Sequence, residues 1–202
     1  MRATLLLAVT VGTVLGAALP FFFPALGGTS SAGTAVRMSV EEAFGHADLV
    51  LEGRVVSGTS ARDAGGMIYT DWEIDVERTF WGDERATRIV RLPGGVLANG
   101  DGLLLPGLPP LTVGEDVVLL LGETSRTGLR MPIGLGQGKY RIVRHLDGTR
   151  TALGAEVGAS YVDGSRVRRS MGARRLGYAE LVARMEASSQ ARAAAAARGE
   201  GR

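Results

Sequence analysis

The sequence predicts a mainly β domain, built as a small antiparallel barrel with a short helix at its start and another at its end. The clearest observation is the alternation between residues 67 and 82. Ile68, Trp72 and Ile74 fall on one side of an extended strand, because successive strand residues point to opposite faces. Short apolar runs separated by Gly, Pro and Asp recur through the middle of the chain, and 30 glycines fit a fold rich in turns.

The strands follow from these runs and their boundaries. We expect strands at residues 47–56, 67–82, 86–92, 116–121, 129–133, 139–146 and 149–153. Residues 116–121 are almost wholly apolar, which predicts a central strand. Asp147-Gly148 predicts a tight hairpin turn, and the polar residues 57–66 predict a loop.

Two helices frame these strands. Ser39 and Glu42 have the spacing of a capping box, so a helix is expected over residues 40–46. Apolar residues recur at helical spacing from Tyr178, which predicts a second helix over residues 178–188. The Ala-rich residues 190–202 could continue this helix, but they offer no apolar face to bury, and we expect fraying or disorder there. This many short strands favours a barrel of the oligonucleotide/oligosaccharide-binding (OB) type, with a β-sandwich as the alternative.

Composition divides the chain into four segments. Residues 1–35 carry no charge after Arg2 and include a long apolar run, typical of a signal peptide or of a retained membrane anchor. Both alternatives predict export to the periplasm, the envelope or the extracellular space. Residues 36–153 form the expected β-barrel domain, residues 154–175 an irregular linker rich in Arg and Gly, and residues 176–202 the terminal helix with its basic tail.

The content of particular residue types excludes several classes of function. The chain has no cysteine, which excludes disulfides, thiolate nucleophiles and Cys-ligated metals. Lys139 is the only lysine, so the many arginines reflect a composition bias, and we predict no nucleic-acid partner. Any contact with a membrane is expected only through the N-terminal segment.

A row of acidic side chains is the candidate partner surface. It consists of Asp71, Glu73, Asp75 and Glu77, which alternate along one strand, with Trp81 at the strand's end. Alternate strand residues lie about 7 Å apart, too far for several carboxylates to share one ion unaided. The row therefore predicts a solvated face balanced by arginines of neighbouring strands, with docking of a basic partner as the alternative. Trp81 is expected to pack against the terminal helix or to contact a partner.

No catalytic, cofactor or metal site is expected. The glycine-rich residues 134–140 lack the spacing of a phosphate-binding loop and lead into a strand, so they predict a kink or a bulge in the backbone. His46 and His145 lie in no metal-ligand spacing, and no Gly-x-Ser-x-Gly motif occurs. The sequence thus predicts a protein that is not an enzyme and binds no cofactor, with a hydrolase whose site forms only on folding as an alternative.

Several short segments resemble the opening strands of netrin-like and metalloproteinase-inhibitor barrels. They are residues 44–55, Ile68-Tyr69 and Phe80-Trp81-Gly82. Residues 92–95, 113–116 and 136–140 are similar to a pattern in uncharacterised exported bacterial proteins of this β layout. The resemblance implies an OB-type barrel. Inhibitors of the netrin-like kind chelate the protease zinc through an N-terminal cysteine, which this chain lacks.

These observations together predict an exported binding or accessory module whose partner is a protein or a component of the envelope. An inhibitor or accessory of an exported metalloprotease is the second hypothesis.

Overall fold

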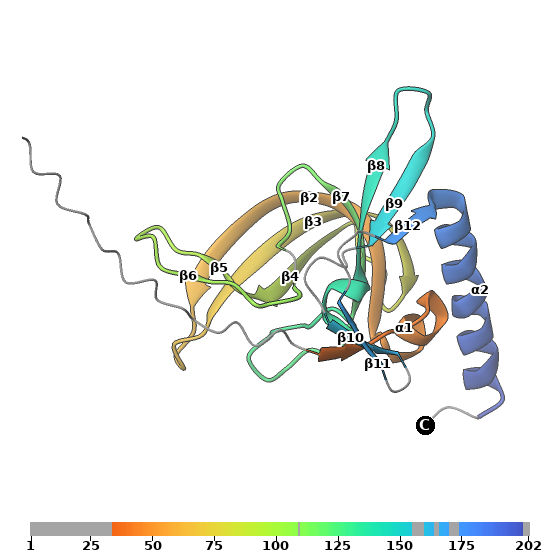
Figure 1. Cartoon of the computed structure of the whole chain (residues 1–202), viewed down its shortest axis with the longest axis horizontal. Coiled ribbons are helices and arrows are strands. Elements are labelled where there is room, and N and C mark those ends of the chain that lie inside the picture. The colour runs from red at the N-terminus through yellow and green to blue at the C-terminus, as the bar shows by residue number, and fades with distance from the viewer. Residues whose placement is uncertain (1–33, 109, 155–159, 164–165, 170–173, 200–202) are drawn as a thin grey trace, which may run out of the picture.

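The body of the protein is a seven-stranded sheet in which every neighbouring pair of strands is antiparallel (Figure 1). The computed structural model describes residues 34–108, 110–154, 160–163, 166–169 and 174–199. In spatial order the strands are β12 (Arg174–Gly177), β9 (Arg150–Gly154), β8 (Lys139–Arg144), β7 (Asp116–Leu121), β2 (Leu49–Arg62), β3 (Ile68–Trp81) and β4 (Thr87–Pro93). The predicted mainly β class is confirmed. The sheet has β12 and β4 as its edges, and these strands close no barrel within the described residues.

Two small sheets accompany the large one. One contains β1 (Thr34–Val36), β10 (Ser160–Asp163) and β11 (Arg166–Arg169), and the other pairs β5 (Gly95–Val96) with β6 (Gly102–Leu103). The structure therefore places strands inside residues 154–175, which were expected to be irregular. Residues 1–33, which contain almost all of the expected signal peptide or anchor, lie outside the described residues.

Strands β2 and β3 form one long hairpin. The predicted loop at residues 57–66 is wrong, because β2 continues to Arg62 and pairs with β3 up to Ile68. Gly58 explains how this polar stretch fits: a Cβ built there would lie 2.4 Å from the Trp72 ring, so glycine leaves room for the indole. The sequence of β3 alternates strongly between apolar and polar residues. It thus stabilises a partner strand whose own sequence is typical of a turn.

The N-terminal helix α1 (Val40–His46) has the predicted bounds. The Glu42 amide donates to Ser39 Oγ at 3.1 Å, and the Ser39 amide donates to the Glu42 carboxylate at 2.7 Å. The capping box is therefore complete and satisfies two amides at the helix start.

The C-terminal helix α2 (Tyr178–Ala197) is longer than expected. The predicted end at Ser188 is wrong, because side chains beyond it bind the body of the protein. Ser189 Oγ donates to the Phe80 carbonyl at 2.7 Å, and the Arg192 guanidinium donates to the Ala47 carbonyl at 2.5 Å. Arg192 thus places a cation at the C-terminal end of α1, where the helix dipole favours positive charge.

Two hydrophobic cores lie on opposite faces of the sheet. One packs α1 and α2 against β7, β8 and β9, and includes Phe44, Tyr140 and Met185. The other lies on the concave face of the curved strands β7, β2, β3 and β4 (Figure 1). Val118 and Leu120 of β7 belong to the first core, whereas its other apolar residues belong to the second, so the strand is buried on both faces.

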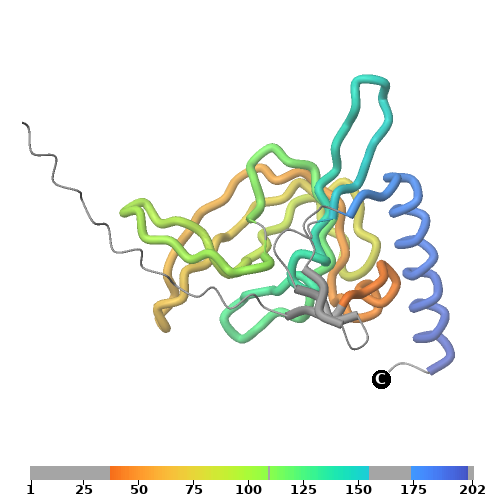
Figure 2. Tube along the Cα trace, viewed as in Figure 1, coloured from red at the N-terminus to blue at the C-terminus, as the bar shows by residue number. Residues whose placement is uncertain are grey.

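Residues 129–133, predicted as a strand, make isolated bridges instead. Leu129 bridges to Arg91 in parallel orientation, and Pro132 bridges to Leu121 in antiparallel orientation. The predicted Asp147-Gly148 turn is present, with Gly148 at φ 81°. The hairpin of β8 and β9 that it closes projects away from the body (Figure 2), and Leu146 at its tip is fully exposed.

Candidate functional site

The acidic row on β3 lies on the face opposite the concave core, and each carboxylate has a partner. Asp71 accepts two hydrogen bonds from the Arg91 guanidinium, at 2.7 and 2.8 Å. Glu73 accepts from the Ser57 hydroxyl at 3.0 Å. The remaining contacts are Thr87 Oγ1 to Asp75 at 3.4 Å and Arg144 to Glu77 at 3.3 Å. The row is thus divided among separate neighbours, and it does not gather its carboxylates around one point.

Trp81 packs onto the two helices. Its ring meets Phe44 of α1 edge to face, with centroids 6.4 Å apart, and the Arg192 guanidinium lies 4.3 Å from the indole centroid. This is the geometry of an aromatic pair with a cation–π contact. The structure therefore places Trp81 in the helix contact, on a different surface from the acidic row.

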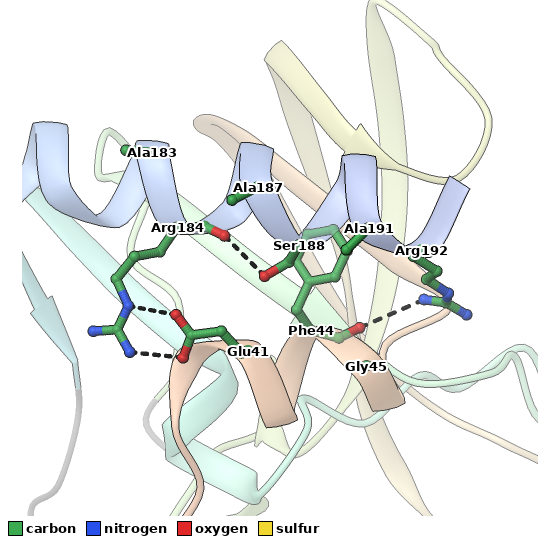
Figure 3. Close-up of a pocket in the computed structure, with 9 residues that line it drawn as sticks. All are labelled: Glu41, Phe44, Gly45, Ala183, Arg184, Ala187, Ser188, Ala191 and Arg192. Carbon is green, nitrogen blue, oxygen red and sulfur yellow. Dashed lines mark hydrogen bonds and ion pairs between the residues drawn. The ribbon is translucent and has the colours of Figure 1, made fainter. Parts of the chain in front are cut away.

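A cleft of about 620 Å³ runs between α1 and α2 (Figure 3). One end is bridged by the Arg184 guanidinium, which donates to the Glu41 carboxylate at 2.6 and 2.7 Å. Arg192 closes the other end, and Ser188 donates back to the Arg184 carbonyl at 2.8 Å. Small side chains form the α2 wall between these ends: Ala183, Ala187 and Ala191. The polar groups named here bind one another across or along the helices. They do not point together at one place where a substrate could react.

The Glu41–Arg184 pair makes helix docking sensitive to acid. Hydrogen bonds from Arg184 lower the pKa of Glu41 from 4.5 to about 2, so its stabilising effect is present above the ordinary carboxyl range. We expect Glu41→Gln to lower the free energy of unfolding by under ~1 kcal/mol at pH 7, because the carboxylate is half exposed. The difference from wild type should vanish as the pH falls to about 2. Urea unfolding at several pH values measures it, with Glu180→Gln, whose carboxylate lies 3.7 Å from Arg184, as the control.

A second hollow, here called the apolar pocket, lies at the far end of the concave face. Its volume is about 250 Å³. The floor comes from β2, β3 and β4, and a segment here called the flap (residues 94–108 and 110–111), which contains β5 and β6, covers it. The lining residues are Ser60, Thr70, Trp72, Leu92, Pro93, Gly94, Gly95, Val96, Leu103, Leu104, Leu105, Leu108, Pro110 and Leu111. A concave, mostly apolar space with few polar groups is the usual form of a small-molecule site.

The two hydroxyls in this lining are satisfied by the protein itself. Thr70 Oγ1 donates to the Gly94 carbonyl at 2.7 Å, and the Ser60 and Thr70 hydroxyls lie 2.9 Å apart. Gly95 passes directly over this pair at φ 135°, where a Cβ would lie 2.1 Å from Thr70 Oγ1. Glycine is therefore required for the flap to approach the floor this closely. A bound molecule needs no polar group to complete the site.

Lys139 anchors the far end of the flap. Its ammonium donates to the Pro110 carbonyl and to the Glu115 carboxylate, both at 2.7 Å, and the Thr112 amide also donates to Glu115 at 2.7 Å. Burial lowers the pKa of Lys139, and the hydrogen bond that its ammonium donates to the Glu115 carboxylate opposes this shift. The only lysine of the chain is thus a buried tie between β8 and the wall of the pocket.

The glycine-rich residues 134–139 form a 3₁₀ helix, η1 (Leu135–Gly138), which leads into β8. A Cβ on Gly138 would lie 2.6 Å from the Ile133 amide nitrogen, so the close backbone crossing requires glycine. The Gly136 amide donates to the Gly107 carbonyl of the flap at 2.7 Å. The predicted kink is thus a turn of 3₁₀ helix that leads the chain into β8, and it is a second anchor of the flap.

The remaining predicted candidates stay apart. His46 and His145 are exposed, and His145 Nε2 lies 2.8 Å from the Thr151 hydroxyl. Within the described ranges, no three His, Asp or Glu side chains are close enough together to hold a metal ion. In the same part of the chain, no helix has the length and apolar character needed to cross a membrane.

Sequence reasoning did not find the apolar pocket. Its signals are the glycine pair Gly94-Gly95, which has positive φ, and the run Leu103-Leu104-Leu105, but both lie where no strand or helix was expected. The leucines come from the flap and the hydroxyls from the hairpin, and only folding brings the two together.

Comparison with known proteins does not place the chain. No protein-family model matches it, and no curated protein is similar to it at a significant level. The resemblance to netrin-like barrels accordingly stays a prediction, and the apolar pocket is assigned from its geometry alone.

Proposed function

We propose that this protein is an exported, non-enzymatic binding module that holds a small apolar ligand in the apolar pocket. The observation that carries the proposal is the lining. Eleven of its fourteen residues have no side-chain atom that can form a hydrogen bond, and the other three are Ser60, Thr70 and Trp72. Filling such a space removes apolar surface from water, at about 25 cal/mol per Å². The flap gives the ligand a wall that is separate from the sheet.

Backbone contacts at residues 129–133 support an OB-type arrangement of the domain. The Arg130 amide donates to the Arg91 carbonyl at 2.9 Å, which links this segment to β4. The Ile133 amide donates to the Leu120 carbonyl at 2.9 Å, which links it to β7. Together with the β7–β2–β3–β4 pairing, these bonds trace a partly closed ring of five segments, the number found in an OB barrel. The apolar pocket lies at one end of this proposed ring.

The proposal of export rests on the N-terminal sequence. Its charge-free apolar run has the length and composition of a signal peptide or an anchor. A mature protein that lacks the first thirty or so residues supports cleavage, and a full-length protein in the membrane fraction supports a retained anchor.

Binding of N-phenyl-1-naphthylamine, an apolar fluorescent probe, tests the function directly. We expect the purified full chain to enhance the probe's emission, with excitation at a wavelength that tryptophan does not absorb. Leu105→Trp, which fills the pocket, should weaken this binding more than tenfold, because the added ring occupies space that the probe needs.

Leu146→Trp is the matched control, because it adds the same ring at the exposed tip of the β8–β9 hairpin. It should bind the probe like wild type. Equal binding by wild type and Leu105→Trp, with both folded by circular dichroism, would refute the apolar pocket as the site.

A further inference from the structure

We propose that the ligand of the apolar pocket is a straight alkyl chain, of the kind found in fatty acids and acylated molecules, which enters by its methyl end. The inference rests on the proposed function and names its ligand class. Three features of the pocket carry it: the chemistry of its wall, its mouth and its volume.

The wall is aliphatic. Six leucines line it, at positions 92, 103, 104, 105, 108 and 111, whereas Trp72 is the only aromatic residue among the lining residues. Because both hydroxyls are already hydrogen-bonded within the protein, a donor or acceptor pushed into the pocket would lose its water without gaining a partner. The wall therefore favours a ligand whose buried part has no polar atom.

The mouth continues this apolar surface into solvent. Val96 and Leu104 both line the pocket, yet they are 62% and 77% exposed. A compact ligand enclosed in the pocket would leave these side chains in water. A chain that extends out of the pocket would cover them, so the mouth favours a ligand longer than the pocket is deep.

The volume sets the length of the buried part. A space of about 250 Å³ is below the range of ~300–1,000 Å³ typical of sites for drug-sized molecules. Taking ~30 Å³ for a group the size of a water molecule or a methylene, it holds roughly eight carbon atoms. Contact with Val96 and Leu104 then extends the recognised chain to roughly ten or twelve carbons.

The polar end of the ligand lies outside the pocket in this arrangement. Arg62, which lies on β2 two residues beyond the lining residue Ser60, donates to the Asp101 carboxylate at 3.1 Å and to the Gly66 carbonyl at 3.0 Å. These bonds tie the β2–β3 turn to the loop between β5 and β6. The structure thus assigns recognition to the chain and leaves the head group to the solvent.

Displacement of N-phenyl-1-naphthylamine by a homologous series tests the inference. We expect straight-chain alcohols from hexanol to decanol to bind about fourfold more tightly for each added methylene, the factor that corresponds to ~0.8 kcal/mol per buried CH₂. The gain should level off beyond roughly twelve carbons, when added methylenes lie past the mouth. Leu104→Ser should weaken the binding of dodecanol more than that of hexanol, because the substitution alters only the mouth.

The possible outcomes can be told apart. Failure of both the probe and decanol to bind, with decanol followed by the Trp72 indole signal, would refute the proposed function. Probe binding with equal displacement by naphthalene and by decanol, or with no dependence on chain length, would refute the alkyl-chain inference while the function stands. Equal affinity for decanoic acid, decanol and an ester of decanoic acid supports recognition of the chain alone, whereas a preference above tenfold for one head group would overturn that assignment.

Discussion

Replacing Lys139 with alanine is expected to lower the free energy of unfolding by about 3–5 kcal/mol, the largest effect that we predict for a single charge. The Lys139 and Glu115 side chains are 8% and 9% exposed, and their charged atoms lie 2.7 Å apart. Without the ammonium, the Glu115 carboxylate stays in a poorly solvated place with no opposite charge. The Pro110 carbonyl also loses its donor, so the end of the flap is released.

Two further variants separate this explanation from a general effect of mutation. The double variant Lys139→Met/Glu115→Gln removes both charges and roughly conserves volume, and it should recover most of the lost stability. Arg54→Ala breaks the 3.1 Å pair with Asp116, but Arg54 is more than half exposed, and the change should be under ~1 kcal/mol. Urea unfolding of wild type and the three variants gives these free energies. If Lys139→Ala lowers the free energy of unfolding as little as Arg54→Ala does, the Lys139–Glu115 pair is not a structural tie.

The second large effect is expected for Met185→Ala, at about 2–5 kcal/mol. Met185 is completely buried in the core between α2 and the sheet, together with Leu181 and Tyr178. Truncation leaves a cavity that a helix held by several polar contacts cannot close by shifting. Thermal or urea unfolding followed by circular dichroism measures the loss.

Glu186→Ala is the neighbouring control. Glu186 is exposed and pairs with Arg78 at 2.9 Å on the surface, so its removal should change stability by under ~1 kcal/mol. A Met185→Ala variant as stable as Glu186→Ala would contradict the close packing of α2 on the sheet.

The elements that were predicted correctly are those whose signals are local. The capping box of Ser39 and Glu42 fixes the start of α1, and the alternation of residues 68–81 makes β3. The apolar residues of β7 bury both of its faces, as a central strand requires.

The errors arise where a distant partner decides the structure. Residues 57–62 are polar and contain Gly58, yet they join β2 because β3 pairs with them along their whole length. The last turns of α2 have no apolar face of their own. They stay helical because Ser189 and Arg192 donate to carbonyls of Phe80 and Ala47, more than a hundred residues away in the chain.

The candidate site depended even more on distant contacts. The acidic row and Trp81 stand out in the sequence, but the structure divides them among separate partners. The apolar pocket, by contrast, is assembled from hydroxyls of the β2–β3 hairpin and leucines of the flap, held by a lysine of β8. No short motif contains this arrangement, because its parts are separated along the chain and each part alone reads as ordinary core or loop.

The central claim, that the apolar pocket binds a small apolar ligand, is tested most directly by the two tryptophan indole signals in a ¹⁵N–¹H correlation spectrum of the full chain. The sequence has only two tryptophans: Trp72 lines the pocket and Trp81 packs on the helices, so Trp81→Phe assigns both signals. On addition of decanol we expect the Trp72 indole signal to shift in a saturable way while that of Trp81 stays in place. A Trp72 signal that does not move, or one that moves only together with Trp81, would contradict the claim.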